Sequence, residues 1–501
     1  MRPKARTPIM KGMRKGIATP ITLVVLMVVF TSLLAATGYM ALGTLRGGAS
    51  ERVTYQAFTV AESALEAFPL LVRCGDNLPS AYTLSVSGGP ALSATYSYPN
   101  RERAVPPGGG EIKVQVEAQV GGGKATLEQT FRVGCGILGA VPAALTSRPN
   151  ISVRGNAQII GYDFAGDSGA YPVTQVLLPG APTPLPADAF SLTVADASLI
   201  PVGSYVQIPS PVVPRAYQVT EVNGNVLTLR PLFPPGLADA ILPGASVSLV
   251  PFAVRAYDPA TSTLTLSDAR GLLVGQTVRV AGVEARVLSV DLGTNQVRLE
   301  WRGAPPTAIP EGTPLVPQIL GAASAGSIST VGAGGISHDK AEYSSLVPSD
   351  PDALFQRTFG LTKEEFLERF PPQPANTFNG TLSGWELKVV RGDLHLTGSG
   401  SICGQGILVV IGDLTVNGTC STGFQGLLYV AGNYNQQGNS VLTGAVVVEG
   451  VANLTAGLTK IAGTGQGRGK IAYDPKVLLK LRLKSQGLAS VKPLAGTWRR
   501  P

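Results

Sequence analysis

The sequence predicts a mainly β protein that begins with a long N-terminal α-helix. Three observations support this class. The 501 residues include 61 glycines and 39 prolines but few charged side chains, which suits short strands joined by tight turns. One uncharged apolar stretch near the N-terminus is long enough for a helix, and two different β-type repeats occur in the body. The predicted architecture is therefore a helix plus antiparallel sheet, joined to a β-solenoid that a duplicated, small β-barrel-like insert interrupts.

The N-terminal stretch lacks charge between Lys15 and Arg46. Residues 21–45 would span a bilayer as a helix, at about 1.5 Å per residue. We therefore expect a leader at 1–16 and the transmembrane half of the helix at 17–45. A plain signal anchor is the alternative. Six basic residues and no acid precede this stretch and predict a cytoplasmic N-terminus with an external body: Arg2, Lys4, Arg6, Lys11, Arg14 and Lys15.

Residues 46–143 are predicted to form a head of one helix and one antiparallel sheet. The helix continues past the apolar stretch with an amphipathic pattern as far as Phe68. From Ile112 to Val120, apolar and polar residues alternate, as on a half-buried strand. Glycines 121–123 then turn the chain into a return strand that carries Leu127, Phe131 and Val133.

Two motifs resemble known protein families. Residues 57–65, AFTVAESAL, resemble the AFxxAExAL stretch of PilX-type minor pilins. The order of basic leader, Gly16 and uncut apolar helix resembles the signal of type IV prepilins. The resemblance implies a type IV pilin-like helix and sheet, cleavage by prepilin peptidase after Gly16, and N-methylation of Ile17. Mature position five would be Ile21 where pilins usually carry Glu, which is compatible with a subunit at the filament tip.

The C-terminal half repeats a short strand motif. Residues 389–396 recur at 409–416, and shorter copies follow at 429–434 and 447–450. The glycines at 392, 412, 432 and 450 are spaced 20, 20 and 18 residues apart. Such a period, with Gly-Asp or Gly-Asn corners, indicates a β-solenoid whose coils stack their apolar faces. We expect this solenoid over 373–460.

Earlier copies indicate that the solenoid begins before the insert. Residues 153–161 share the same pattern and predict a first coil within 144–180. A further coil is expected at 328–336, within a continuation at 321–372. Asp350 followed by Pro351 predicts a helix start over 350–370, and 473–484 is expected to form another helix.

The insert over 181–320 is itself duplicated. Residues 192–197 match 264–269, and 202–206 match 274–278, at a constant offset of 72. Each copy is small enough for a five-strand barrel or barrel-like unit. The two units are interpreted as binding modules, with inert spacers as the alternative.

The four cysteines of an exported chain are expected to form disulfides. Sequence context favours Cys74–Cys135 and Cys403–Cys420, one of three possible connectivities. The chain has no CxxC motif and only two histidines, His338 and His395, which argues against a zinc site. No cofactor or metal is expected.

Charge suggests a polyanion-binding surface. Without the leader, 34 basic residues face 32 acidic ones, but residues 460–501 hold ten basic residues and one acid, Asp474. We expect a basic C-terminal segment at 461–501, either a solvated face or a contact for phosphates. The favoured DNA-binding candidates are Lys460, Arg468, Lys470, Lys476, Lys480, Arg482 and Lys484. Further candidates are Arg279, Arg286, Arg298 and Arg302 in the insert, and Lys388 and Arg391 on the solenoid.

Together these features resemble the PilX-like minor pilins, including competence-associated β-solenoid pilins of the ComZ type. The resemblance implies a minor pilin near the pilus tip that acts in natural transformation. It implies inner-membrane insertion before assembly, a periplasmic or extracellular body and a final place in the pilus at the cell surface. The implied partners are other type IV pilins, prepilin peptidase and double-stranded DNA.

Two other function classes stay open at this point. The insert would suit an adhesive tip pilin that binds surfaces or cells. Some solenoids cleave polysaccharides with carboxylates stacked on neighbouring coils, and Asp393 and Asp413 would stack in this way. Asn433 and Val451 follow them in register, however, and such ladders are common at solenoid turns. We therefore expect no enzyme.

Overall fold

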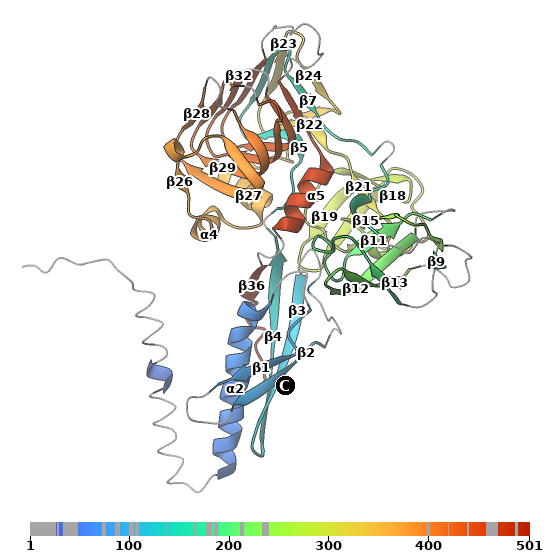
Figure 1. Ribbon diagram of the computed structural model, residues 1–501, viewed down its shortest axis with the longest axis vertical. Helices are drawn as coiled ribbons and strands as arrows, with labels where there is room; N and C mark the ends of the chain where they lie inside the picture. Colours follow the sequence, from blue (N-terminus) through green and yellow to red (C-terminus); the bar gives the residue numbers. More distant parts are fainter. Residues whose placement is uncertain are drawn as a thin grey trace, which may run out of the picture.

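The computed structural model confirms the mainly β class. A helix-and-sheet head lies at the bottom of Figure 1, the solenoid lies above it, and two barrels lie to one side. The structure describes residues 27, 30–33 and 49–500, with gaps at 73–76, 86–90, 100–104, 106–109, 137, 165–166, 177–182, 185–188, 211–214, 233–239, 398–400, 419, 438–439, 457–468 and 486–488.

The head packs one helix, α2 (Ala49–Leu71), against a five-stranded antiparallel sheet. Its strands, in spatial order, are β1 (Ala81–Leu84), β2 (Leu92–Ser97), β3 (Gly110–Val120), β4 (Gly123–Cys135) and β36 (Ala489–Pro493). The predicted alternation holds, because Ile112, Val114 and Val116 are buried in one cluster with Leu65 and Phe68 of α2. The apolar face of the helix thus covers the apolar face of the sheet.

The predicted long helix is described mainly from Ala49 onward. The leader, the cleavage site and most of the apolar stretch lie outside the described residues. Among the helices that the structure does describe, none combines the length and the apolar character needed to cross a bilayer.

The fifth strand of the head was not anticipated. β36 pairs with β4 from Ala489 opposite Cys135 to Pro493 opposite Phe131. Beyond it, Arg499 forms a 2.7 Å ion pair with Glu128, and the ring of Trp498 lies 6.4 Å from that of Phe58. The C-terminal residues therefore form a strap along the head.

The expected separate segment at 461–501 is thus divided among three parts of the molecule. Its described residues contribute β35 (Lys470–Ala472) to the solenoid and β36 to the head. Between them, α5 (Pro475–Lys484) lies against the solenoid and both barrels, as the predicted helix at 473–484. Pairing and packing with distant strands, rather than charge, decide where this segment lies.

The solenoid repeat is confirmed. Val389, Val409, Tyr429 and Val447 stack in register on successive parallel strands. Four coils follow one another, each made of a longer and a shorter strand: β27 (Thr381–Arg391) and β28 (Leu394–Leu396), β29 (Cys403–Ile411) and β30 (Leu414–Val416), β31 (Phe424–Val430) and β32 (Tyr434–Gln437), β33 (Val441–Val448) and β34 (Ala452–Ala456).

The coils do not stack in chain order. The coil that comes first in the sequence has β33 and β34 on one side and the 320–337 coil on the other. The solenoid is therefore built from two runs of coils that meet at the coil that is earliest in the sequence. That earliest coil comprises β5 (Ala143–Ser147), β6 (Ile151–Gly155) and β7 (Gln158–Ile160). The 320–337 coil comprises β22 (Leu320–Ser324), β23 (Ile328–Val331) and β24 (Gly335–Ser337).

Between the two runs, the chain crosses the solenoid as α3 (Pro351–Phe359) and α4 (Lys363–Arg369), flanked by the short strands β25 (Lys340–Ala341) and β26 (Gln373–Pro374) and the turn η1 (Ala375–Thr377). Asp350 caps α3, as predicted, and Thr362 forms a capping box with Glu365 in α4. Phe355 and Phe359 of α3 pack on Tyr429 of the solenoid, and Phe366 of α4 packs on both of these rings.

The insert forms two six-stranded barrels, one strand more per barrel than the expected five. Both share one strand order, and an isolated bridge closes each: Val176 with Val194 in the first barrel and Ala253 with Pro314 in the second. The first barrel begins at Tyr171, before the predicted boundary at 181. Its strands are β8 (Tyr171–Gln175), β10 (Phe190–Thr193), β11 (Tyr205–Ile208), β12 (Arg215–Asn223), β13 (Val226–Pro231) and β15 (Ser246–Val250), with the pair β9 (Thr183–Pro184) and β14 (Ala240–Ile241) beside them.

The second barrel repeats the first in detail. A bulge lies after Val219 in β12 and after the equivalent Val287 in β19. This agreement confirms the duplication inferred from the sequence. The strands are β16 (Val254–Asp258), β17 (Thr263–Leu266), β18 (Thr277–Val280), β19 (Val283–Asp291), β20 (Gln296–Trp301) and β21 (Leu315–Pro317).

Candidate nucleic-acid interface

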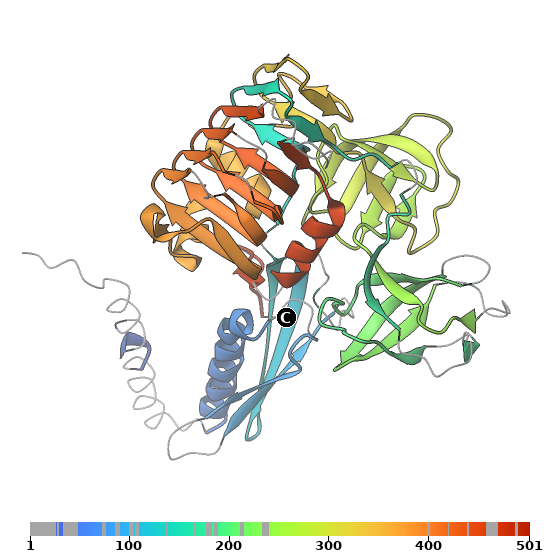
Figure 2. The same cartoon turned by 45° about the horizontal axis from the view of Figure 1, so that its top comes forward.

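Helix α5 lies between the solenoid and the two barrels (Figure 2). Asp474 caps its N-terminus by accepting from two backbone N–H groups, and Pro475 occupies the first turn. Leu478 and Leu481 pack with the solenoid and α3, whereas Leu479 and Leu483 pack with the first barrel. A helix that buries so much of its circumference has only a narrow face left for contact with a ligand.

That remaining face carries three of the predicted DNA-binding residues. Lys476, Lys480 and Lys484 follow one another at a spacing of four and therefore share one side of the helix, over about 12 Å. Lys476 and Lys484 are exposed. The Lys480 ammonium lies 4.3 Å from the ring centroid of Trp385. We refer to these three lysines as the α5 stripe.

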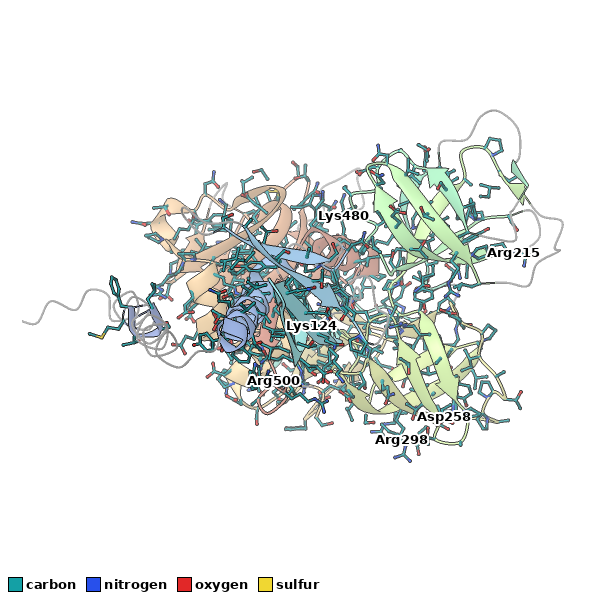
Figure 3. All side chains as sticks on the ribbon, turned by 90° about the horizontal axis from the view of Figure 1, so that it is seen from below. Lys124, Arg215, Asp258, Arg298, Lys480 and Arg500 are labelled. Atoms are coloured by element: carbon teal, nitrogen blue, oxygen red, sulfur yellow. A yellow bond between two sulfur atoms is a disulfide. The ribbon has the colours of Figure 1, made fainter. Side chains whose placement is uncertain are left out.

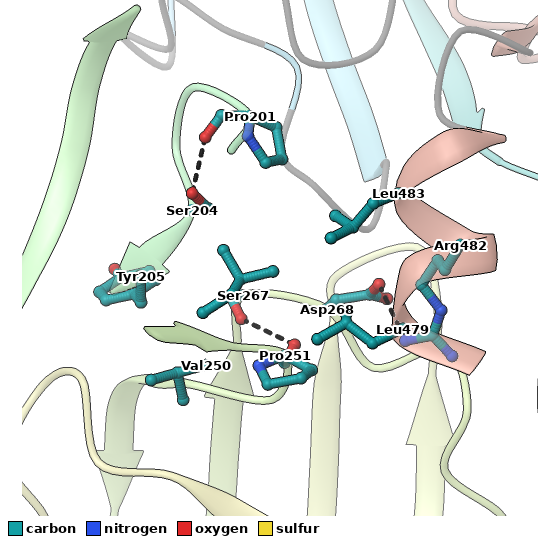
Figure 4. Close-up of a pocket in the computed structure, with 11 residues that line it drawn as sticks. Pro201, Ser204, Tyr205, Val250, Pro251, Ser267, Asp268, Leu479, Arg482 and Leu483 are labelled. Atoms are coloured by element: carbon teal, nitrogen blue, oxygen red, sulfur yellow. Dashed lines mark hydrogen bonds and ion pairs between the residues drawn. The ribbon is translucent and has the colours of Figure 1, made fainter. Parts of the chain in front are cut away.

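Arg482, in contrast, points into the protein and is not available to DNA. Its guanidinium lies 3.6 Å from the carboxylate of Asp268 (Figure 4). Arg270 contacts the same carboxylate at 3.0 Å. Burial of Arg482 lowers its pKa from the ordinary value. Burial alone would raise the pKa of Asp268, but the charges of Arg270 and Arg482 outweigh it and lower that pKa. Arg482 is therefore a structural residue of this interface, which corrects its prediction as a phosphate contact.

The four insert arginines all lie in the second barrel, but they differ in their contacts and exposure. Arg279 donates to the backbone carbonyls of Phe164 and Asp167 and stacks on the Phe164 ring, so it fixes the linker that enters the first barrel. Arg302 lies 3.6 Å from Glu284. Arg286 and Arg298 are exposed, and neither has an ion-pair partner among the residues that the structure describes.

The remaining candidates are scattered. Lys388 pairs with Glu386 at 3.3 Å, Arg391 is exposed at the solenoid corner, and Lys470 is half-buried in β35. Lys460 and Arg468 lie outside the described residues. Figure 3 shows Lys480 and Arg298 on opposite sides of the body. The predicted cations that the structure describes therefore do not form one patch, and the α5 stripe is the most compact group among them.

The Asp residues considered for polysaccharide cleavage serve the solenoid turns. Asp393 accepts from the backbone N–H of Asp413, which in turn accepts from that of Asn433. Asn433 accepts from the N–H of Val451 in the same way. Each side chain thus ties its coil to the next, which accounts for the repetition of Asp and Asn along this ladder.

Steric crowding explains why glycine occupies the solenoid corners. A Cβ atom on Gly412 would lie 2.6 Å from the backbone of Gly392, and one on Gly450 would lie 2.5 Å from the carbonyl oxygen of Gly432. Successive coils approach too closely there for any side chain.

The bridge between Cys403 and Cys420 is present, with 5.8 Å between the Cα atoms, as predicted. Cys74 and the side chain of Cys135 lie outside the described parts, so their pairing stays a prediction. Within the described residues, no group of three or more His, Cys, Asp or Glu side chains could hold a metal ion.

No family model and no curated protein sequence matches the chain. One similar solved structure is the competence-associated pilin ComZ from Thermus thermophilus, at 12% sequence identity and a TM-score of 0.21. The match covers 89% of this chain and 97% of that chain. Similarity at this level does not establish a common fold.

Proposed function

We propose that this chain is a minor subunit of the type IV pilus class, located at or near the pilus tip, that contacts DNA during natural transformation. The head carries the proposal. It combines a helix packed along an antiparallel sheet with a preceding apolar stretch and a Gly16 that ends a basic leader. The body lies at the opposite end of the head from the start of α2 (Figure 1), where a tip subunit would present it outward.

This role entails a defined processing and location. Prepilin peptidase cleaves after Gly16 and methylates Ile17, and the apolar helix holds the protein in the inner membrane until it assembles with other pilins. The body then lies in the periplasm and finally at the cell surface. Mass spectrometry of pilus-associated protein checks this step, and an intact N-terminus in piliated cells would contradict it.

The α5 stripe supports DNA as the ligand. Three lysines on one helix face match a contact with successive phosphates, which is independent of sequence and sensitive to salt. We propose a binding rather than a catalytic role for the solenoid, since the Asp393 and Asp413 carboxylates are occupied by backbone N–H groups. In the part of the insert that the structure describes, we find no comparable feature that favours the adhesive alternative.

The test uses protein without residues 1–46 and a labelled duplex over a range of salt concentrations. Replacing Lys476, Lys480 and Lys484 with Gln should weaken binding and lower the slope of log affinity against log salt by roughly one unit per lost contact. Lys124→Gln is the matched control, because Lys124 is exposed on the head and pairs only with Glu117 among the described residues. Unchanged affinity and slope in the triple variant would exclude the stripe as the DNA contact.

A further inference from the structure

Among the described strand pairings of the solenoid, one has a break in register. In the pairing of β27 with β29, Leu382 lies opposite Gly404 and Glu386 opposite Gly406. The three residues 383–385 therefore face a single residue, Gln405. On the next coils, the same position holds one residue each, Gln425 and Thr443, with no break in register. β27 thus has a local bulge at the end of a regular ladder.

The bulge places Trp385 in an unusual backbone conformation. Its φ angle is 65°, in the left-handed region that bulky residues avoid. Gly384 precedes it at φ 66°, and the backbone N–H of Ser383 donates to the Glu386 carboxylate at 2.7 Å, which fixes the bulge. Strained residues of this kind are concentrated at ligand sites, where the surrounding structure maintains them for a purpose.

The strained tryptophan lies beside the α5 stripe. Its half-buried ring is covered by the ammonium of Lys480, and Lys476 and Lys484 flank that lysine on the same helix face. An aromatic ring with one cation on its face, and a further cation one helical turn away on either side of that lysine, presents the two features that single-stranded nucleic acids need. The ring stacks on a base of any identity, and the cations contact the phosphates on either side.

We propose that Trp385 is a stacking platform for one unpaired base and that the site therefore prefers single-stranded to duplex DNA. This inference rests on the proposed DNA-binding function and specifies the form of DNA that the site takes. When a strand binds, its base replaces the Lys480 ammonium on the ring face, and Lys480 turns to a phosphate. A base inside an intact duplex offers no free face to the ring.

The test compares a short oligothymidylate with a blunt duplex of equal length, using the full chain in detergent. Trp385→Ala should weaken oligothymidylate binding by about tenfold, within the range for one base–aromatic stack. Its effect on duplex binding should stay below about twofold. Trp385→Phe should retain most of the single-strand affinity, because an aromatic face remains. It should lose the quenching of tryptophan fluorescence that oligothymidylate causes in the unaltered protein.

The outcomes separate this inference from the function on which it rests. If Trp385→Ala weakens both probes equally, the ring only positions Lys480 and the stacking role is wrong. If quenching by oligothymidylate persists in the folded Trp385→Phe protein, another tryptophan reports binding and the assignment also fails. An unaltered protein that binds neither probe overturns the DNA-binding function itself.

Discussion

The two barrels have the same fold but different relations to the rest of the molecule. Asp196 of the first barrel and Asp268 of the second occupy equivalent positions in the repeated motif, and each accepts from the backbone N–H two residues later. Asp196 is exposed, whereas Asp268 is 4% exposed and pairs with Arg270 and Arg482. The same turn position is thus exposed in the first barrel and lies at the centre of a buried interface in the second.

The contacts of the barrels with α5 differ in kind as well. The first barrel meets the helix through the apolar side chains of Leu479 and Leu483, and the second through the ion pair at Arg482. The turn between β19 and β20 also reaches the head, where the backbone N–H of Glu111 donates to the carbonyl of Gly293 at 3.2 Å. The two units share one fold, and the residues that differ between them determine how each one docks.

The largest effect should come from Asp268→Ala. Loss of the Asp268 carboxylate leaves Arg482 buried beside Arg270 without an acidic partner. Breaking a buried pair in this way costs about 3–5 kcal/mol of stability. Asp196→Ala, the matched control, should change stability by about 0.5 kcal/mol or less, as is usual for an exposed site. Urea unfolding of both variants measures the difference, and equal midpoints would contradict the distinction between the barrels.

Acid should reduce the effect of Asp268. The pKa of this carboxyl is lowered in the folded protein, so its stabilisation is fully present above the unfolded value of about 3.9 and is lost as pH falls through the folded pKa. Asp268→Asn has no carboxylate at any pH. The gap in unfolding midpoint between this variant and the unaltered protein should therefore narrow below about pH 4. A gap that stays constant to the acid limit would mean that the carboxylate charge does not contribute.

The apolar contact of the first barrel should be less costly to disrupt. Leu483→Ala removes buried apolar surface at the edge of a small pocket, where neighbouring side chains do not fully enclose it, so we expect a loss of about 2–3 kcal/mol, at the low end for such a change. The loss should not depend on salt, because no charge is involved. Leu242→Ala, on a side chain 38% exposed in the same barrel, is the control. Thermal unfolding at low and high salt provides the measurement.

The smallest effect concerns DNA. Arg286 and Arg298 of the second barrel correspond to Gln218 and Thr228 of the first, according to the matched strand registers. If the exposed arginines contact phosphates, Arg286→Gln with Arg298→Gln should lower the salt slope by up to about two units. The reverse exchange, Gln218→Arg with Thr228→Arg, should raise it only if the first barrel also faces the DNA. Duplex titrations over a salt series distinguish the two barrels.

Short sequence patterns correctly predicted those strands, corners and caps that depend only on residues close together in the sequence. The strand from Ile112, the stacked corner glycines and the cap at Asp350 each follow from alternation, spacing or turn chemistry within a few residues. The barrels were recognisable because the same pattern occurs twice, although one strand in each escaped notice.

Long-range pairing could not be predicted in this way. Arg482 lies among lysines in a basic segment, and nothing nearby in the sequence indicates that Asp268 will bury it. β36 is too short and too weakly patterned to indicate β4 as its partner. The ring of Trp385 was overlooked because its significance depends on a bulge and on a helix that arrives from far along the chain.

The strap on the head has a consequence for synthesis and for mechanical stress. Because β36 follows the solenoid and both barrels in the chain, the sheet of the head becomes complete only after they have been made. The body also joins the head through the end of β4 and the beginning of β36, which are neighbours at one end of the sheet. A pull on the body is therefore divided between two covalent connections side by side, and neither strand bears it alone.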